Sequence, residues 1–244
     1  MFEFSLSTVL LIAGINFMAA FLQASVGFGY AILAMSFMPL ILPMRFSSAI
    51  SAVTVVVIAL QMVIMLRKNL SLRVVMIPVL SCMLTTNVGL YILMNYPENI
   101  LRIVLASFLI LLTIYFVISQ KKKLKIKKSL FNSILFGLLT GISTGMFNIV
   151  GPFFMIYYFN VCKDNLNFKA NIEFSFLVAG LYSTLLHILY GNMTMEVAPY
   201  IVASTIGAIV AGFIGIRLFY KLNREAITKI IYIALPLMAF LLLR

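Results

Sequence analysis

Long apolar segments, separated by short polar turns, follow one another along the whole chain. Two of them exceed a single membrane crossing and contain a small, polar interruption: Leu6–Pro43 is interrupted at Gln23–Gly29, and Leu130–Cys162 is interrupted at Gly141–Asn148. The others have about the length of one span, because a transmembrane helix needs about 20 apolar residues. They are Ser47–Leu66, Val74–Met94, Ile100–Ser119, Ala170–Leu189, Val197–Phe219 and Ala226–Leu243. The pattern predicts an all-α, polytopic integral membrane protein.

The order of these segments repeats along the chain. Each half opens with an interrupted segment and continues with three spans, and the basic run Lys121–Lys128 separates the halves. Ser25 and Gly27 in the first interruption match Ser143 and Gly145 in the second, as expected of an internal duplication. We therefore expect about five segments in each repeat, with broken or short helix pairs opening both. The predicted boundaries are 1–119 for the first membrane repeat, 120–128 for a basic cytoplasmic linker and 129–244 for the second membrane repeat.

The distribution of charge predicts the orientation of the repeats. The chain carries 18 Lys and Arg but only 6 Asp and Glu, for a net charge of +12. Because Lys and Arg concentrate in cytoplasmic loops, Arg67–Arg73, Lys121–Lys128 and Arg217–Arg224 are expected on the cytoplasmic side. The first interrupted segment then has both ends outside and the second has both ends inside, so the two repeats are inverted relative to one another. Inverted repeats with interrupted helices are typical of secondary transporters, which bind substrate at the interruptions.

The composition excludes other broad classes of protein. Hydrophobic residues make up 64% of the chain and charged residues 10%, which is far too apolar for a soluble domain. Membrane topology accounts for the basic surplus, so we expect no nucleic-acid partner. The sequence has a single histidine and none of the common phosphate-loop, zinc-protease or serine-hydrolase motifs, so neither an enzyme nor a metal or cofactor site is expected. Cys82 and Cys162 lie in apolar runs, which does not indicate a disulfide framework.

The two interruptions carry the candidate binding groups. Glycine lets backbone N–H groups approach a ligand, and a helix that begins at such a break directs its positive end toward an anion. Close helix packing through small residues is the alternative explanation. A half-helix beginning near Pro152 would be capped by Asn148 or Gly151. The candidates for substrate contact are Gln23, Ser25, Gly27, Gly29, Ser143, Thr144, Gly145, Asn148 and Gly151.

Two titratable side chains of one predicted span are candidates for proton coupling. Glu173 lies one turn inside this span, where an acidic residue is functional by default. Lys169 lies four residues earlier, so an ion pair at the membrane interface is the favoured alternative for Glu173. His187, near the other end of the span, has the pKa range of a proton relay, and an anchor at the membrane interface is its favoured alternative.

At the interruptions the sequence resembles the TauE/SafE family of sulfite exporters and sulfonate uptake permeases. The family carries two glycine-rich stretches, each followed by an apolar run, and Gln23–Gly29 and Gly141–Gly145 are similar to them. His187–Asn192 is similar to the closing pattern of the family's second half. Runs of consecutive glycines are thinner here, with Phe28 and Phe147 among the intervening residues. The resemblance implies a secondary transporter for sulfite, a sulfonate or another organosulfur or carboxylate anion.

The residues alone leave other functions open. A passive anion channel would use the interruptions to line a pore, and a non-transporting membrane scaffold would use them only for packing. For the transporter we expect alternating access in a multi-pass protein of a prokaryotic inner membrane. Its expected partners are the lipid bilayer, a small anionic substrate, a coupling proton or sodium ion and a second copy of the chain.

Overall fold

The computed structural model describes residues 5–121 and 126–221, and the described chain is helical without strands. Its helices are α1 (Leu6–Val26), α2 (Tyr30–Phe37), η1 (Met38–Leu40), α3 (Met44–Leu66), η2 (Arg67–Asn69), α4 (Leu72–Asn95), α5 (Glu98–Lys121), α6 (Leu130–Phe147), α7 (Gly151–Val161), α8 (Asn165–Leu189) and α9 (Ala198–Phe219). Six of them are long and apolar enough to cross a membrane, which confirms the predicted membrane class. The predicted span Ala226–Leu243 and positions 122–125 of the predicted linker lie outside the described residues.

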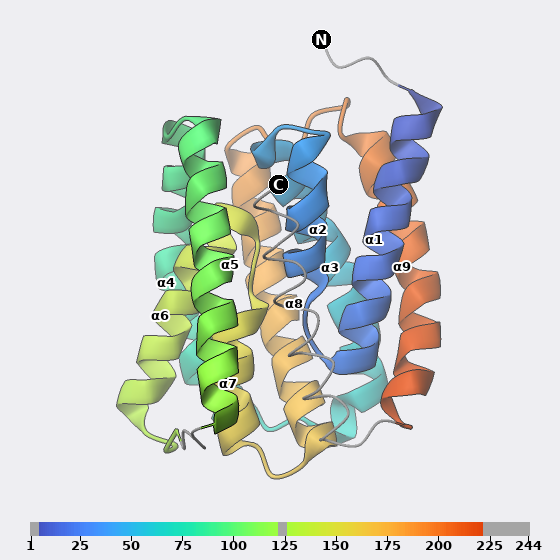
Figure 1. Cartoon of the computed structure of the whole chain (residues 1–244). Coiled ribbons are helices and arrows are strands. Elements are labelled where there is room, and N and C mark those ends of the chain that lie inside the picture. Colours follow the sequence, from blue (N-terminus) through green and yellow to red (C-terminus); the bar gives the residue numbers. More distant parts are fainter. Residues whose placement is uncertain (1–4, 122–125, 222–244) are drawn as a thin grey trace.

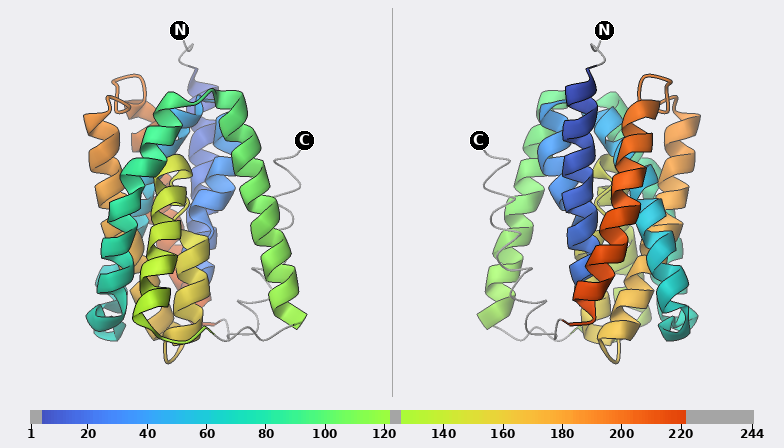
Figure 2. Two further views of the ribbon diagram at one scale, coloured as in Figure 1. Left: turned by 90° about the vertical axis from the view of Figure 1, so that its left-hand side faces the viewer. Right: turned by 90° about the vertical axis from the view of Figure 1, so that its right-hand side faces the viewer.

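Each interrupted segment folds into a helical hairpin whose tip lies inside the molecule. In Figure 1, α1 runs down from the upper end and α2 runs back up toward it, while α6 rises from the lower end and α7 returns there. The views of Figure 2 show the same opposed directions. With eight residues in α2 and 11 in α7, neither returning helix reaches the length of about 20 residues that a crossing needs.

Both breaks in the helices are shorter than the sequence predicts. In the first hairpin α1 continues to Val26, so the non-helical link is residues 27–29. In the second, α6 continues to Phe147, and the prediction that Gly141–Phe147 is broken backbone is wrong. Gly141 and Gly145 instead let the intact helix α6 pack closely on α4, whose backbone occupies the space that larger side chains would need.

Helices from the two halves of the chain pair side by side. The closest pairs are α1 with α9, α4 with α6, and α3 with α8. Small residues let two of these pairs approach to backbone contact. A Cβ added to Gly141 would lie 2.1 Å from the Cys82 carbonyl oxygen on α4, and one added to Gly215 would lie 2.9 Å from the Phe21 oxygen on α1. The first and second halves therefore share one core.

Basic residues of the described chain concentrate at the lower end of the molecule in Figure 1. This end holds η2, the starts of α4 and α6, the turn between α7 and α8, and the end of α9. The basic residues of these segments are Arg67, Lys68, Arg73, Lys127, Lys128, Lys163, Arg217 and Lys221. The described parts of the segments expected on the cytoplasmic side thus lie at one end of the helices.

Candidate functional site

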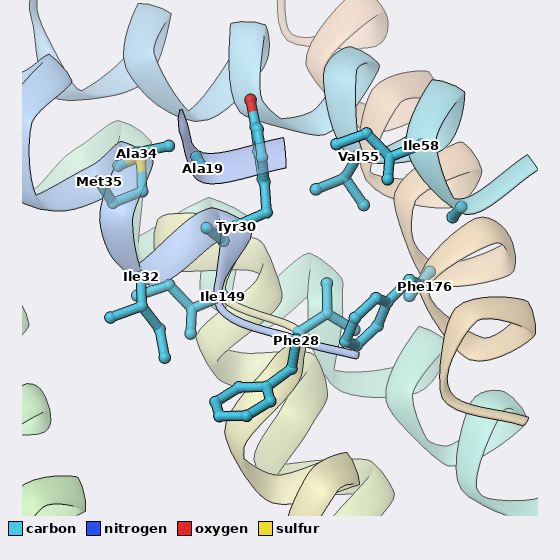
Figure 3. Close-up of a cluster of buried hydrophobic side chains, with 14 of the residues drawn as sticks. Ala19, Phe28, Tyr30, Ile32, Ala34, Met35, Val55, Ile58, Ile149 and Phe176 are labelled. Carbon is cyan, nitrogen blue, oxygen red and sulfur yellow. The ribbon is translucent and has the colours of Figure 1, made fainter. Parts of the chain in front are cut away.

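The tips of the two hairpins meet in the middle of the molecule. Figure 3 shows Phe28 from the first break close to Ile149 from the second and to Phe176 of α8. A Cβ added to Gly151, at the start of α7, would lie 3.4 Å from Phe28 Cβ and 3.7 Å from Phe176 Cζ. Segments more than a hundred residues apart in sequence thus form one site, as the placement of the candidate residues at two matching interruptions suggests.

A small cavity lies between the two tips. Its volume of about 10 Å³ has room for about one water molecule. The lining comes from both breaks and from α3 and α8: Gln23, Gly29, Ala31, Ile32, Val55, Asn148, Ile149, Val150, Gly151 and Phe176. No side chain in this lining is charged. Four of the predicted substrate residues, Gln23, Gly29, Asn148 and Gly151, are among those that line it.

Both returning helices begin at this cavity. Gly29 caps α2 with a left-handed φ of 108°, and Pro152 occupies the first turn of α7, as predicted for a helix start. The first four N–H groups of a helix have no partner inside the helix, and together they carry partial positive charge. Because first-turn residues of α2 and α7 line the cavity, two helix N-termini point their positive ends toward it.

Asn148 connects the second break to α3. Its backbone, with a left-handed φ of 52°, closes α6 by donating to the Thr144 carbonyl at 2.7 Å. Val150 caps α7 and Gly151 is its first residue, so the expectation that Asn148 or Gly151 caps α7 is wrong. The Asn148 Nδ2 lies 3.0 Å from the Ser51 hydroxyl, while its buried Oδ1 has no hydrogen-bond partner. The Ser51 hydroxyl can donate or accept, so the amide can present either an acceptor or a donor to the cavity.

The other predicted substrate residues do not line the cavity. The Thr144 hydroxyl donates to the Thr140 carbonyl at 2.7 Å within α6, and the Ser143 hydroxyl lies 3.0 Å from the Thr140 carbonyl oxygen and 2.8 Å from the Ile149 carbonyl oxygen of the second break. Gly145 lies against α4, because a Cβ there would be 2.1 Å from the Thr86 carbonyl oxygen. Ser25 is buried with no partner for its hydroxyl. Packing and bonds to backbone carbonyls thus account for the positions of Ser143, Thr144 and Gly145.

Lys169 and Glu173 form an ion pair inside the protein. Lys169 Nζ lies 2.9 Å from Glu173 Oε1, and both side chains have no exposed surface. The expected ion pair is present, but protein encloses both side chains, whereas the sequence predicts that they face the membrane interface. The spacing of four residues on a helix predicts the pairing. Its burial was missed because it depends on the end of α1, which is far away in sequence.

The ion pair holds Gln23 of the first hairpin through two bonds. Lys169 Nζ donates to the Gln23 carbonyl oxygen at 2.6 Å, and the Gln23 side-chain Nε2 donates to Glu173 Oε2 at 2.9 Å. Gly27 lies next to this pair, since a Cβ on Gly27 would be 3.3 Å from Lys169 Cδ. Gln23 also lines the cavity, so it connects the charged pair to the meeting point of the hairpins.

His187 belongs to a polar cluster near the upper ends of α3 and α8. It is fully buried, so the expected anchor at the membrane interface is wrong. The Asn192 amide Nδ2 lies 3.0 Å from His187 Nδ1, and the Ser48 hydroxyl lies 3.2 Å from Nε2. An amide donor at Nδ1 leaves the proton on Nε2, which then donates to Ser48. We call Ser48, His187 and Asn192 the upper clamp.

A second polar cluster joins the opposite ends of the same helices. The Asn167 amide at the start of α8 donates to the Asn69 carbonyl at 2.8 Å and to the Ser71 hydroxyl at 2.9 Å. The Ser71 backbone N–H donates to Asn171 Oδ1 at 2.8 Å. We call these four residues the lower clamp. Polar bonds therefore join the first and second halves on both sides of the cavity.

Comparison with known proteins gives a family match. The sequence model of the family described as "Sulfite exporter TauE/SafE" matches residues 12–242, nearly the whole chain. No curated protein and no solved structure matches it. The matched region includes both hairpins and the cavity between them.

Proposed function

The chain belongs to the sulfite exporter TauE/SafE family, and we propose that it is a secondary transporter that binds a small anion between its two hairpin tips. The family implies a membrane transporter of sulfite or related anions. For this chain we propose a sulfite-like oxyanion or a sulfonate as substrate, and the inner membrane of a prokaryotic cell as its location.

One observation carries this proposal. Both returning helices begin at the same cavity, and its lining includes two amide side chains, Gln23 and Asn148, but no carboxylate. Backbone N–H groups at helix N-termini and neutral amides bind oxyanions without a full positive charge in the site. An anion placed there would meet donors from both halves of the chain.

Alternating access follows from the same arrangement. The cavity is small, and the two clamps join the helices on either side of it, which favours a carrier over a channel with a continuous pore. We propose that the upper and lower clamps release in turn, so that the cavity widens and opens to one side at a time. Inverted repeats with paired half-helices operate in this way.

Reconstituted protein tests the proposal. Liposomes with the purified chain should take up radiolabelled sulfite or 2-hydroxyethanesulfonate at a saturable rate, and an excess of unlabelled anion should compete. Asn148→Leu should reduce the rate at least about tenfold, because a lost charge-assisted hydrogen bond and an inserted apolar group together cost about 1.4 kcal/mol or more. Asn95→Leu, at an exposed end of α4, is the matched control and should transport normally.

Three results would contradict the proposal or part of it. Absence of flux for both sulfite and 2-hydroxyethanesulfonate would contradict the proposed transport of these anions. Single-channel currents in planar bilayers, together with an uptake rate that never saturates, would instead support the passive channel. Normal flux in Asn148→Leu would show that the substrate does not bind between the hairpin tips.

A further inference from the structure

A full positive and a full negative charge lie beside the first break, and the anion site proposed above does not use them. Of the residues whose burial is described, Lys169 and Glu173 are the buried members of the Lys, Arg, Asp and Glu classes. A charge at this depth is costly, and a buried ion pair is often no more stable than a well-packed apolar pair. Stability alone therefore gives little reason for placing this pair in the core.

Among the described residues, no other charged side chain forms an ion pair with Lys169 or Glu173. Glu173 meets Lys169 on its own helix and the neutral Gln23 amide on α1. On the α9 side, Lys169 Nζ lies 5.2 Å from the centroid of the Phe219 ring. From α7, the Tyr158 hydroxyl bonds Ser175 of α8 at 2.7 Å. Lys169 is the charged group that faces the Glu173 carboxylate, so any change in the charge of Glu173 acts directly on Lys169.

Gln23 carries the effect of such a change to the cavity. Its carbonyl oxygen is bound by Lys169, its side-chain amide is bound by Glu173, and it lines the cavity. A Glu173 carboxylate cancels the charge of Lys169 and repels an incoming anion. When Glu173 is protonated, both effects disappear, and the Lys169 ammonium becomes an uncompensated cation next to Gly27 at the first break.

We infer that Lys169 and Glu173 couple the binding of one anion to the binding of one proton; this inference rests on the transport function proposed above. In the empty carrier the ammonium and the carboxylate cancel. In the loaded carrier Glu173 holds the proton as a neutral acid, and the charge of Lys169 cancels that of a monovalent anion. The cluster is neutral in both states, so neither state moves an uncompensated charge through the membrane. By linkage, anion and proton strengthen each other's binding.

This coupling also defines a substrate class. A monovalent anion such as a sulfonate or hydrogen sulfite leaves the loaded cluster neutral, whereas a divalent anion leaves an extra negative charge in the core. Monovalent anions should therefore be carried together with a proton and without net charge movement. Glu173 is the proton-binding residue in this scheme, and Lys169 compensates the charge of the anion.

Liposomes that contain a pH-sensitive dye test the coupling. The probe is 2-hydroxyethanesulfonate, which stays a monovalent anion over the pH range of the assay. An inward gradient of this anion should acidify the lumen of liposomes with the wild-type protein, and an imposed membrane potential should leave the rate unchanged. Glu173→Gln should still exchange labelled for unlabelled anion, because the amide oxygen can accept from Gln23, but should lose the acidification completely. Lys169→Gln should lose anion flux, and Lys169→Arg should restore it.

Two further variants separate coupling from folding. Glu98→Gln breaks an exposed ion pair of the same spacing, Glu98 with Arg102, and should leave flux and acidification unchanged. The double variant Lys169→Gln/Glu173→Gln has no unpaired charge, so it should remain folded yet move no protons. Acidification by Glu173→Gln at the wild-type ratio to anion flux would overturn the inference, even if the variant is less stable. Absence of anion flux in the wild-type protein would instead refute the transport function.

Discussion

At the residue scale, Gly27 and Gly29 give the tip of the first hairpin a backbone conformation that other residues adopt only with strain. Their φ angles are 105° and 108°. The second tip turns with Asn148, whose φ is 52° and which belongs to the residue types that tolerate this region. The two tips therefore use different residue types for a similar reversal, and only the first combines left-handed glycine with a charged neighbour.

Gly27→Ala should destabilise the protein. Left-handed backbone costs a residue other than glycine about 1–3 kcal/mol, and the new Cβ would lie 3.2 Å from Phe168 Cε1 as well. Because the chain has no tryptophan, thermal unfolding in detergent is followed by thiol labelling or static light scattering, and its midpoint measures the loss of stability. Gly191→Ala is the comparison variant: Gly191 has a left-handed φ of 71° as well, but no atom lies within 4 Å of the added Cβ, so this variant should lose less stability than Gly27→Ala. Equal stability of Gly27→Ala and the wild type would contradict the strained tip.

At the scale of elements, close packing through glycine explains where the sequence misleads. Gly137, Gly141 and Gly145 form a stripe with a spacing of four residues on α6, and each faces the backbone of α4. From the sequence alone, a glycine that breaks a helix cannot be distinguished by residue type from a glycine that lets a second helix approach. The spacing of four favours packing, whereas neighbouring glycines such as Gly27 and Gly29 indicate a break.

Gly141→Val should separate α4 from α6. The added side chain would meet the Cys82 carbonyl oxygen at 2.1 Å, a backbone atom that cannot move without its helix, so a loss of about 1–3 kcal/mol or more is expected. The midpoint of thermal unfolding in detergent measures it. Gly14→Val on α1 is the control, because nothing lies within 4 Å of a Cβ there. If both variants unfold at the wild-type temperature, α4 and α6 do not pack through this stripe.

The two clamps should control opposite sides of the carrier. A cysteine placed at Ile32, in the cavity lining, reports access when Cys82 and Cys162 are replaced by serine or alanine. His187→Ala removes both side-chain bonds of the upper clamp, and Asn167→Ala removes two of the three bonds of the lower clamp. Each lost hydrogen bond is worth about 0.5–1.5 kcal/mol and each variant loses two, so the population open on the weakened side should rise about fivefold or more.

Labelling with a membrane-impermeant maleimide measures this shift. His187→Ala should accelerate labelling of the Ile32 cysteine from the side of the upper clamp, and Asn167→Ala from the opposite side. Asn95→Ala, outside both clamps, serves as the control. Acceleration from the same side by both variants would show that the clamps do not act as alternating gates.

At the scale of the whole molecule, the basic end should lie in the cytoplasm. Lys68 and Lys128 are exposed at the end where basic residues concentrate, and Asn95 is exposed at the opposite end of α4. Cysteines at Lys68 and Lys128 should therefore react with an impermeant reagent only after the cells are opened, whereas a cysteine at Asn95 should react in intact cells. Labelling of all three in intact cells would contradict the single orientation.

The sequence predicts the class and the segmentation of this molecule better than its site. Apolar segments near the length of a bilayer leave few alternatives to membrane helices, and their polar turns lie close to the observed helix ends. The contacts of the site are different, because they join Gln23 to Glu173 and Phe28 to Gly151 across the two halves. No local pattern contains such a pairing. It follows from how α1, α3 and α8 pack, and the burial of Lys169 and Glu173 follows with it.

The pairing of helices across the two halves also affects how the protein is made. Gln23 and Glu173 are separated by 150 positions, and α1 packs on α9 still later in the chain. At about 5–20 residues per second, the polar end of α1 waits on the order of ten seconds for its partner on α8. During this interval the amide of Gln23 has no ion pair to bind. The first half is therefore synthesised before its packing partners, and its contacts with α8 and α9 form only after the second half has been made.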